Sequence, residues 1–442
     1  MRLFEVALIL ANLLTLLLSV TKPSRAVWLG AAGVNLAALF AHGVLEGIRW
    51  QMACSYLIAV LLTGYALVRA GDRSSKLRIP GALRGVAVSL GLAILAFTAF
   101  LAHALPVFTL PEPTGDEAVG FRYVHLVDER RAEPFLANTT QKRELMIKVY
   151  YPAEPDDTKT YAPYFNGSTE LMGAFASFYG LPSFAFSHFR LVQTHAKANL
   201  RPSDKEQTYP VVLFSHGAGT TPEVETAQSE DLASHGYVVV AIDHTYVSAA
   251  TVFPDRLVTA RQATTNFDVP EPAEPITQIM ADDDQFVIQQ LGALNAGAID
   301  PTLKGKLNLD TIGVIGHSVG GATAYNMATR DSRVKAAIDL DGTVYVTPAN
   351  AQVIAPLLML ANDKYHVQAI QNRQSLMEKF DDTPEGQQML RDFYGSKAAY
   401  DEQYRKAQHN IDGLADVLQG SGELYTITGS DHMKFTDIGL FF

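Results

Sequence analysis

The sequence predicts a mostly parallel, doubly wound α/β domain that follows a region of four transmembrane helices. Four apolar runs fill the first 106 residues, and short β-type runs alternate with helix-type stretches after residue 119. The first 106 residues hold nine Lys and Arg against three Asp and Glu, and the remainder holds 26 against 43. We therefore expect two physically different bodies, at 1–106 and 119–442, joined by a linker at 107–118 that contains the Pro/Gly-rich LPEPTG.

The apolar runs predict membrane-spanning helices. They cover roughly residues 3–20, 26–45, 51–69 and 85–105. Each approaches the ~20 residues with which a helix crosses a ~30 Å hydrocarbon core. The first and third loops hold seven basic residues, and the N-terminus and second loop hold two. Because basic loops stay in the cytoplasm, we expect an integral membrane protein (in the cytoplasmic membrane if bacterial) whose large acidic domain, at 119–442, is extracytoplasmic.

Composition excludes several classes of site and partner. The single cysteine, Cys54, excludes an internal disulfide and any multi-cysteine metal site. The net charge of −11 argues against nucleic acid as a partner. Since no cluster with metal-ligand spacing stands out, we expect no metal and no cofactor. The acidic run Asp282–Asp284 lies in a helix-type stretch and is predicted to be a solvated face.

The second body shows the pattern of a parallel sheet. Its β-type runs lie at 121–127, 144–152, 209–215, 237–243, 311–316, 334–340, 356–362 and 423–429. The later runs are continuously apolar, as strands buried on both faces are. Helix-type stretches separate them, at 223–235, 276–296, 319–330 and in part of 384–418. This alternation favours right-handed crossovers in a doubly wound sheet.

A nucleophile elbow is predicted at Gly316-His317-Ser318-Val319-Gly320. The motif directly follows a β-type run and directly precedes a helix-type run, which is the context that a catalytic serine on a sharp turn requires. Glycines on both sides let neighbouring backbones approach. The following helix aims its N–H groups at a developing oxyanion. Ser318 is therefore the predicted nucleophile.

A catalytic serine needs a histidine base and an acid that orients it, in the chain order Ser, acid, His. Of the three histidines after Ser318, His432 follows the last strand, where a catalytic histidine is expected. His409 lies in a polar helix-type stretch and is expected at the surface. His366 follows a strand too closely to act as the base. For the acid, Asp341 ends the strand after the elbow and Asp363 ends the next one. The residues alone leave both open.

The remaining requirement is a pair of N–H groups for the oxyanion. The run 209–215 is followed by His216-Gly217-Ala218-Gly219, a strand-then-HG turn of the required kind. The backbone N–H groups of Ala218 and Val319 are therefore the predicted donors. We expect His216 to brace this loop rather than to act as a base.

Together these residues resemble a known family. The segment YPVVLFSHGAG, the elbow GVIGHSVGGATA, the strand AAIDLDG and the terminal GSDHMKFTD are similar to the platelet-activating factor acetylhydrolases, which have the α/β-hydrolase fold. The similarity covers about 119–437. It implies Ser318, Asp341 and His432 as the triad, Ala218 and Val319 as oxyanion donors, and no metal. Asp341 is favoured over Asp363 because the family's acid lies 23 residues after its nucleophile.

The chain departs from the family at two site positions. Val319 stands where the family usually has Phe, and Ala218 stands where it has Leu, so the lining of the pocket changes while both backbone donors are retained. The membrane part is absent from the secreted animal enzyme, so localisation does not follow from the resemblance.

The predicted function is a serine carboxylic ester hydrolase acting on short-acyl or oxidised phospholipids or related small esters. An acyltransferase with the same triad and a non-catalytic membrane sensor on a hydrolase scaffold are the alternatives. An aromatic-rich insertion at about 161–200 is either a satellite core or an interfacial flap that admits lipid. No pattern in the chain indicates an oligomeric state.

Overall fold

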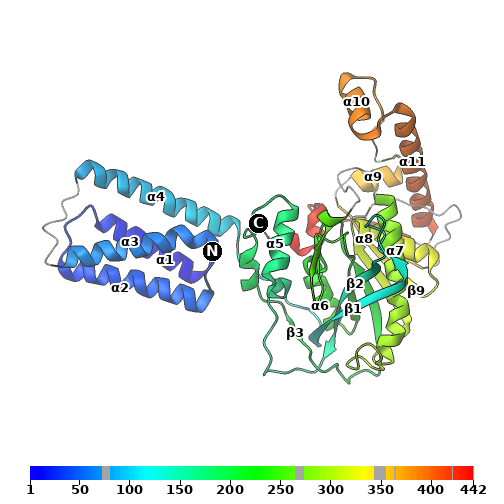
Figure 1. Cartoon of the computed structure of the whole chain (residues 1–442), viewed down its shortest axis with the longest axis horizontal. Coiled ribbons are helices and arrows are strands. Elements are labelled where there is room, and N and C mark those ends of the chain that lie inside the picture. The colour runs from blue at the N-terminus through cyan, green and yellow to red at the C-terminus, as the bar shows by residue number, and fades with distance from the viewer. Residues whose placement is uncertain are drawn as a thin grey trace. The chain divides into compact units, whose positions relative to one another are not determined.

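The chain divides into two compact units. The computed structural model describes residues 1–71, 80–263, 273–342, 355–362 and 365–441 except 376, 378 and 421. One unit comprises 1–109, 184–192 and 440–442, and the other comprises 110–183 and 193–439. Figure 1 colours both units by residue number. Residues 184–192 therefore leave the insertion and join the N-terminal unit.

The N-terminal unit is built from four apolar helices. They are α1 (Leu3–Leu18), α2 (Arg25–Ala41), α3 (Ala53–Ala70) and α4 (Gly81–Ala104). Short π and 3₁₀ turns extend two of these, at His42–Glu46 and Trp50–Met52. Within the described residues, three stretches are long and apolar enough to cross a membrane: Arg25–Glu46, Trp50–Ala70 and Gly81–Ala104.

The expectation of four spanning helices is not met, because α1 is short. It has 16 residues, which is about 24 Å at 1.5 Å per residue and less than a ~30 Å hydrocarbon core. The helix ends before the apolar run does, at Ser19, whose N–H and hydroxyl both bond the carbonyl of Leu16.

Polar side chains lie inside this unit and large apolar ones lie outside. The Asn12 amide donates to the Ser55 hydroxyl at 2.9 Å, and the Asn35 amide donates to Thr15 at 2.7 Å. The outward apolar side chains include Phe40, Phe97 and Phe100 together with Leu14 and Leu61. Such an arrangement suits helices that pack through polar contacts while lipid surrounds them.

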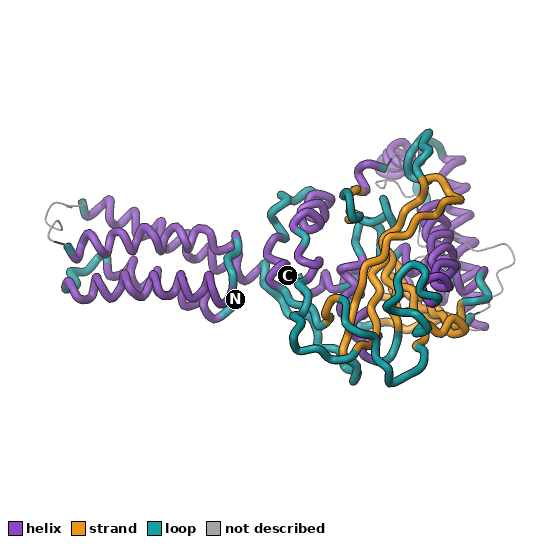
Figure 2. Tube along the Cα trace, turned by 60° about the horizontal axis from the view of Figure 1, so that its bottom comes forward, coloured by secondary structure: helices purple, strands orange, loops and turns teal. Residues whose placement is uncertain are grey.

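The second unit is a nine-stranded sheet with strand order β11-β10-β9-β8-β4-β5-β2-β1-β3. Its strands are β1 (Ala118–Ala132), β2 (Lys142–Ala153), β3 (Ala196–Ala198), β4 (Tyr209–Ser215), β5 (Val238–Asp243), β8 (Leu307–His317), β9 (Val334–Leu340), β10 (Leu357–Ala361) and β11 (Gly422–Thr426). Pairing is antiparallel only at β1–β2 and β2–β5. The prediction of a mostly parallel sheet is confirmed, and Figure 2 shows its strands side by side.

Helices cover both faces of this sheet. Apolar residues of α7 (Ala273–Asn295), α8 (Val319–Arg330) and α11 (Lys397–Gly420) share one core with the sheet. A second core includes Ala233 of α6 (Thr226–Ser234). The other helices and the hairpin are α5 (Thr169–Phe178), α9 (Tyr365–Gln371), α10 (Pro384–Met389), β6 (Ala250–Val252) and β7 (Leu257–Thr259). The carboxyl ends of β4, β8 and β9 therefore meet at one edge, where α/β sheets bind ligands.

The prediction that Asp282–Asp284 is a solvated face is wrong for two of its three residues. Asp283 and Asp284 are buried, with 0% and 1% exposure. Arg143 on β2 meets Asp283 with two nitrogens, at 2.6 and 3.1 Å. Although burial opposes ionisation, this guanidinium holds the pKa of Asp283 below its usual range. Charge runs on helices are usually solvated. Asp283 can be buried here because its partner Arg143 is buried on a strand that is distant in the sequence.

The same network reaches the carboxyl ends of two central strands. His244, which follows β5, bonds Asp283 through Nδ1 and the Ser215 hydroxyl through Nε2, each at 3.0 Å. Ser215 ends β4 and donates to Asp284 at 3.1 Å. Burial raises the pKa of Asp284 well above its usual range, and the adjacent Asp283 adds to the shift. These bonds tie α7 to the edge of the sheet where the predicted site lies.

Replacing Arg143 with methionine should be strongly destabilising, because it leaves Asp283 buried without its cation. We expect a loss of about 3–5 kcal/mol in the free energy of unfolding, measured by denaturant titration in detergent. Arg201→Met is the control, since the Arg201 ion pair is exposed and should contribute less than about 1 kcal/mol. Equal losses in the two variants would contradict this account.

Candidate active site

Ser318 lies on a strained turn between β8 and α8. Its backbone has φ 59° and ψ −121°, a conformation that L-residues rarely adopt. The Ser318 N–H donates to the Leu340 carbonyl at 3.0 Å, and the Ser318 carbonyl accepts from the Ala322 N–H at 3.1 Å. The turn is therefore held on one side by β9 and on the other by the first turn of α8, as a nucleophile elbow is.

Glycine is required on both sides of this serine. A Cβ atom on Gly316 would lie 2.1 Å from the Gly320 carbonyl oxygen, and one on Gly320 would lie 2.0 Å from the Ser215 carbonyl oxygen. Both obstacles are backbone atoms, which cannot rotate away. The two glycines of the motif G-x-S-x-G are thus required because chain segments approach closely at both positions, in addition to the turn at the serine.

Asp341 and His432 form a short hydrogen bond. His432 Nδ1 lies 2.6 Å from Asp341 Oδ2. Asp341 is 2% exposed, and it begins a turn after β9 with φ 56°. Its N–H bonds the Leu360 carbonyl of β10 at 2.8 Å. The carboxylate therefore stands at the carboxyl edge of the sheet, one strand beyond the elbow, and it faces the histidine.

Two residues that sequence reasoning missed hold this pair. Asn362 donates to both oxygens of Asp341, through its backbone N–H at 2.6 Å and its side-chain amide at 2.8 Å. His317 Nε2 donates to the His432 carbonyl at 2.8 Å, and the two rings are 4.6 Å apart. The only signal in the sequence was proximity, because Asn362 directly follows β10 and His317 lies inside the elbow motif.

The other acids differ in position from Asp341. Asp363, the alternative acid, lies outside the described residues. Asp339 is fully buried on β9, where its Oδ1 accepts the Gly342 N–H at 2.6 Å. Burial raises the pKa of Asp339 to about 7, and the neighbouring Asp341 charge adds to the shift. Asp339 also packs against Gly321, because a Cβ on Gly321 would lie 2.1 Å from Asp339 Oδ1. Asp339 therefore contacts the first turn of α8, directly after the elbow.

The loop after β4 adjoins Ser318. A Cβ on Gly217 would lie 3.2 Å from Ser318 Cβ and 3.0 Å from His317 Nδ1. Ala218 is exposed. Among the described residues, the backbone N–H groups of Ala218 and Val319 donate to no protein acceptor. No described protein group therefore engages either of the two predicted oxyanion donors.

The final segment of the second unit is anchored near His432 by buried bonds. The carboxylate of Asp437 accepts the Tyr164 hydroxyl at 3.0 Å and the Thr226 N–H at 3.1 Å. Gln228 donates to the Phe435 carbonyl at 2.9 Å. Burial raises the pKa of Asp437 to about 8. The loop that carries His432 is therefore fixed on the N-terminal turn of α6.

The aromatic-rich insertion serves two different units. Helix α5 buries Leu171, Met172 and Phe175 in the second unit. At its end, the Tyr179 hydroxyl donates to the Gly219 carbonyl of the loop after β4 at 3.1 Å. Residues 184–192 pack in the N-terminal unit, where the indole of Trp50 donates to the Ala185 carbonyl at 3.1 Å. The insertion is therefore not one continuous satellite core.

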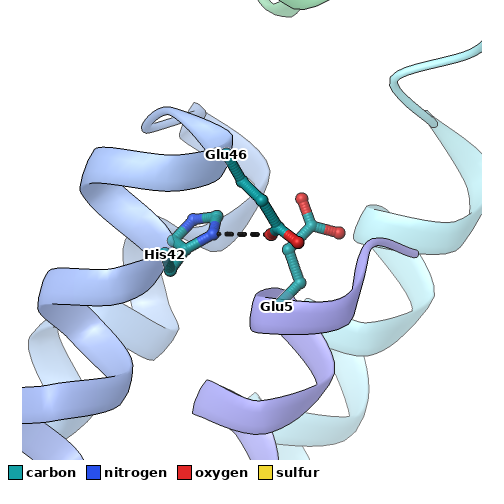
Figure 3. A group of neighbouring side chains, drawn as sticks. All are labelled: Glu5, His42 and Glu46. Atoms are coloured by element: carbon teal, nitrogen blue, oxygen red, sulfur yellow. Dashed lines mark hydrogen bonds and ion pairs between the residues drawn. The ribbon is translucent and has the colours of Figure 1, made fainter.

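A group of potential metal ligands lies in the N-terminal unit, where Figure 3 shows Glu5, His42 and Glu46 close together. Their ligand atoms already have protein partners. Arg49 bonds both oxygens of Glu5 at 2.7 Å. His42 bonds Glu46 at 3.1 Å and the Tyr56 hydroxyl at 2.7 Å. These contacts form a network of ion pairs and hydrogen bonds that joins helix ends.

The Gly320→Ala variant tests the close approach at the elbow. Because the added methyl group meets the Ser215 carbonyl, we expect a loss of about 3 kcal/mol or more in the free energy of unfolding. Gly292→Ala is the matched control: Gly292 lies in α7 with open space around it, and alanine there should stabilise by about 0.5–1 kcal/mol. Thermal denaturation of both variants in detergent checks this, and an unchanged Gly320→Ala would contradict it.

Comparison with known proteins gives a consistent result. The sequence profile of the family described as platelet-activating factor acetylhydrolase, isoform II, matches residues 105–290 and 293–442. The platelet-activating factor acetylhydrolase of Cavia porcellus is 28% identical over 261 residues, covering 53% of this chain and 58% of that protein. The probable 1-alkyl-2-acetylglycerophosphocholine esterase of Arthroderma benhamiae is 26% identical over 261 residues, covering 57% and 63%. The chain thus spans about three fifths of these relatives.

A solved structure extends the similarity to three dimensions. A ferulic acid esterase from Streptomyces cinnamoneus superposes with a TM-score of 0.53 at 27% identity, covering 75% of this chain and 80% of that one. This likeness reaches beyond the residues matched in each curated relative, and it agrees with the mostly parallel sheet.

Proposed function

Because the chain belongs to the platelet-activating factor acetylhydrolase, isoform II, family, we propose that it is a serine-dependent carboxylic ester hydrolase. Its proposed substrates are short-acyl or oxidised phospholipids, or related small esters. The observation that carries the proposal is the 2.6 Å bond between His432 and Asp341, at the same sheet edge as the strained Ser318. A histidine oriented by an acid activates a serine hydroxyl group when the two meet, and we propose that His432 and Ser318 do so at this edge.

In the proposed mechanism Ser318 attacks the ester carbonyl while His432 Nε2 accepts the hydroxyl proton. Asp341 fixes the histidine with its hydrogen on Nδ1, and Asn362 holds Asp341. The N–H groups of Ala218 and Val319 stabilise the oxyanion that forms. His432 then protonates the leaving alcohol, and water hydrolyses the acyl-enzyme by the same steps in reverse.

Exposure of the base favours hydrolysis over acyl transfer to another alcohol. The His432 side chain is 42% exposed, so water can reach the nitrogen that must activate it. An acyltransferase requires the opposite condition, because water competes for the acyl-enzyme.

The triad proposal predicts distinct effects for three variants. Ser318→Ala and Asp341→Asn should each lower kcat by about 10³-fold or more, because these groups act as a unit. Asp363→Asn should leave kcat within about threefold. The assay uses detergent-solubilised protein with p-nitrophenyl acetate, butyrate and octanoate beside an sn-2-acetyl phosphatidylcholine.

Each result of this assay has a defined meaning. Serine-dependent turnover of the phospholipid, with activity falling on longer chains, supports the phospholipid substrate. Activity on simple esters alone restricts the substrate to a general carboxylic ester. A normal Asp341→Asn beside an inactive Asp363→Asn would reassign the acid. If Ser318→Ala kept full activity, Ser318 would be rejected as the nucleophile.

We also propose that the α/β domain is extracytoplasmic. The supporting argument is the charge of residues 69–84, from the end of α3 to the first turn of α4, which hold five of the seven basic residues counted above. Since the domain follows α4, it lies on the membrane side opposite this segment whether or not α1 spans. The proposal therefore does not depend on whether three or four helices cross.

A reporter fused after residue 441 tests this placement. Alkaline phosphatase, which folds only outside the cytoplasm, should be active there, and a cytoplasm-dependent fluorescent protein should remain dark. As the matched control, the same reporters inserted in the loop between α3 and α4 should give the reverse pattern. An inactive phosphatase together with a fluorescent reporter at residue 441 would show that the orientation is the opposite one.

A further inference from the structure

The predicted oxyanion loop rests on the segment that follows β5. The Gly219 N–H donates to the Val247 carbonyl and the Ala249 N–H donates to the Thr220 carbonyl, each at 2.8 Å. His216, at the start of the loop, is 0% exposed. Backbone bonds thus fix the far end of the loop, and a side-chain contact must fix its near end, where Gly217 adjoins Ser318.

That side-chain contact is made by His216 in one defined tautomer. Its Nε2 accepts the backbone N–H of His244 at 3.2 Å, and an amide N–H can only donate, so Nε2 carries no hydrogen. The hydrogen is on Nδ1, which donates to the Gly217 carbonyl at 2.7 Å. Burial, with the neighbouring His244 and His317, lowers the pKa of His216 to about 3, so the ring stays neutral.

Donor counting then fixes the proton on the next residue. The Ser248 hydroxyl lies 2.7 Å from His216 Nε2, and because that nitrogen has no hydrogen, Ser248 must donate. Ser248 also makes a very short contact with Asp243 Oδ1 at the end of β5. Its only hydrogen is already used, so the hydrogen in this second contact must come from the carboxyl group of Asp243.

We propose that Asp243 is a positioning residue that acts as a neutral carboxyl group. It donates to Ser248, Ser248 donates to His216, and His216 donates to the Gly217 carbonyl, so that a chain of hydrogen bonds running in one direction holds the oxyanion loop against Ser318. The inference rests on the proposed function for its catalytic consequence. The proton on Asp243 follows from the donor count along these contacts and does not depend on the proposed function.

The surroundings of Asp243 favour its neutral form. It lines a largely apolar cavity of about 260 Å³ together with Tyr123, Lys148 and Glu223. Burial raises the pKa of Asp243 to about 8, and the Glu223 charge adds to the shift. The contact with the Ser248 hydroxyl, the bond from the Thr251 hydroxyl at 2.7 Å and the more distant Arg143 guanidinium lower this pKa in part. Within the described residues no ion pair reaches the Asp243 carboxyl.

Ionisation of Asp243 should loosen the loop. Because the carboxyl is neutral in the folded protein, the hydrogen-bond chain is intact below about pH 8 and is lost as the pH rises through that value. The carboxylate then takes the Ser248 hydrogen, and His216 Nε2 keeps only the weaker bond from the His244 N–H. Since the loop binds an oxyanion that exists only in the transition state, kcat should fall on the alkaline side while KM changes little.

Three variants test the proposal against a matched control. In Asp243→Asn the amide can donate to both hydroxyls and cannot ionise, so kcat at pH 7 should stay within about threefold and the alkaline fall near pH 8 should disappear. Ser248→Ala interrupts the chain, so it should lower kcat by about 10-fold below pH 8 and approach the wild-type rate above that pH. Asp243→Ala should behave like Ser248→Ala. Asp255→Asn, at an exposed site, should keep the wild-type pH profile.

An infrared difference spectrum supplies a readout independent of catalysis. At pH 7, wild type minus Asp243→Asn should contain the carbonyl stretch of one protonated carboxyl group, and this band should vanish above pH 9. Absence of the band overturns the proposal whatever the activity is. Serine-dependent activity whose alkaline fall survives in Asp243→Asn overturns it as well. Activity that persists in Ser318→Ala rejects the proposed nucleophile instead, and leaves the infrared result to decide the proton on Asp243.

Discussion

The candidate site depends on one steric constraint, the left-handed backbone of Ser318 at a place where three chain segments touch. The turn is possible because Gly316 and Gly320 have no side chains where the Ser215 and Gly320 carbonyls approach. The same closeness brings the loop after β4 beside the serine. The strain at Ser318 is therefore stabilised by packing that also assembles the other parts of the site.

Around this turn, buried polar groups rather than apolar ones set the geometry. Asn362 fixes Asp341, His317 fixes the backbone of His432, and Asp437 fixes the loop between that histidine and the end of the chain. Arg143 and Asp283 support the strand ends from the other side. Each of these bonds replaces water, so the loss of one partner leaves a buried group unsatisfied, which costs more than the bond itself contributes. Asp341, His432 and Asp437 are therefore each held by at least one buried or half-buried hydrogen bond.

Local patterns predicted much of the fold, and long-range partners account for what they missed. The eight β-type runs, the elbow and the terminal histidine are properties of contiguous residues, and the sheet built from those runs is confirmed. By contrast, Asp283 and Asp284 have buried partners, Arg143 and Ser215, on strands far away in the sequence. Asn362 bonds Asp341 from the end of the neighbouring strand. Strand β3 has three residues and forms only through pairing with β1. Helix α1 stops early through capping bonds that hydropathy does not register.

The path of the chain between the two units has a practical consequence. Residues 184–192 and 440–442 belong to the N-terminal unit. There the rings of Phe186, Phe189 and Phe441 contact one another, and Phe108 contacts Phe189 and Phe441. A fragment that begins at residue 110 would keep three of these rings and lose Phe108 and the helices beneath them. The exposed aromatic surface would favour self-association of the fragment. Preparing a soluble catalytic fragment therefore requires redesign of these two internal segments, and trimming the N-terminus alone is not sufficient.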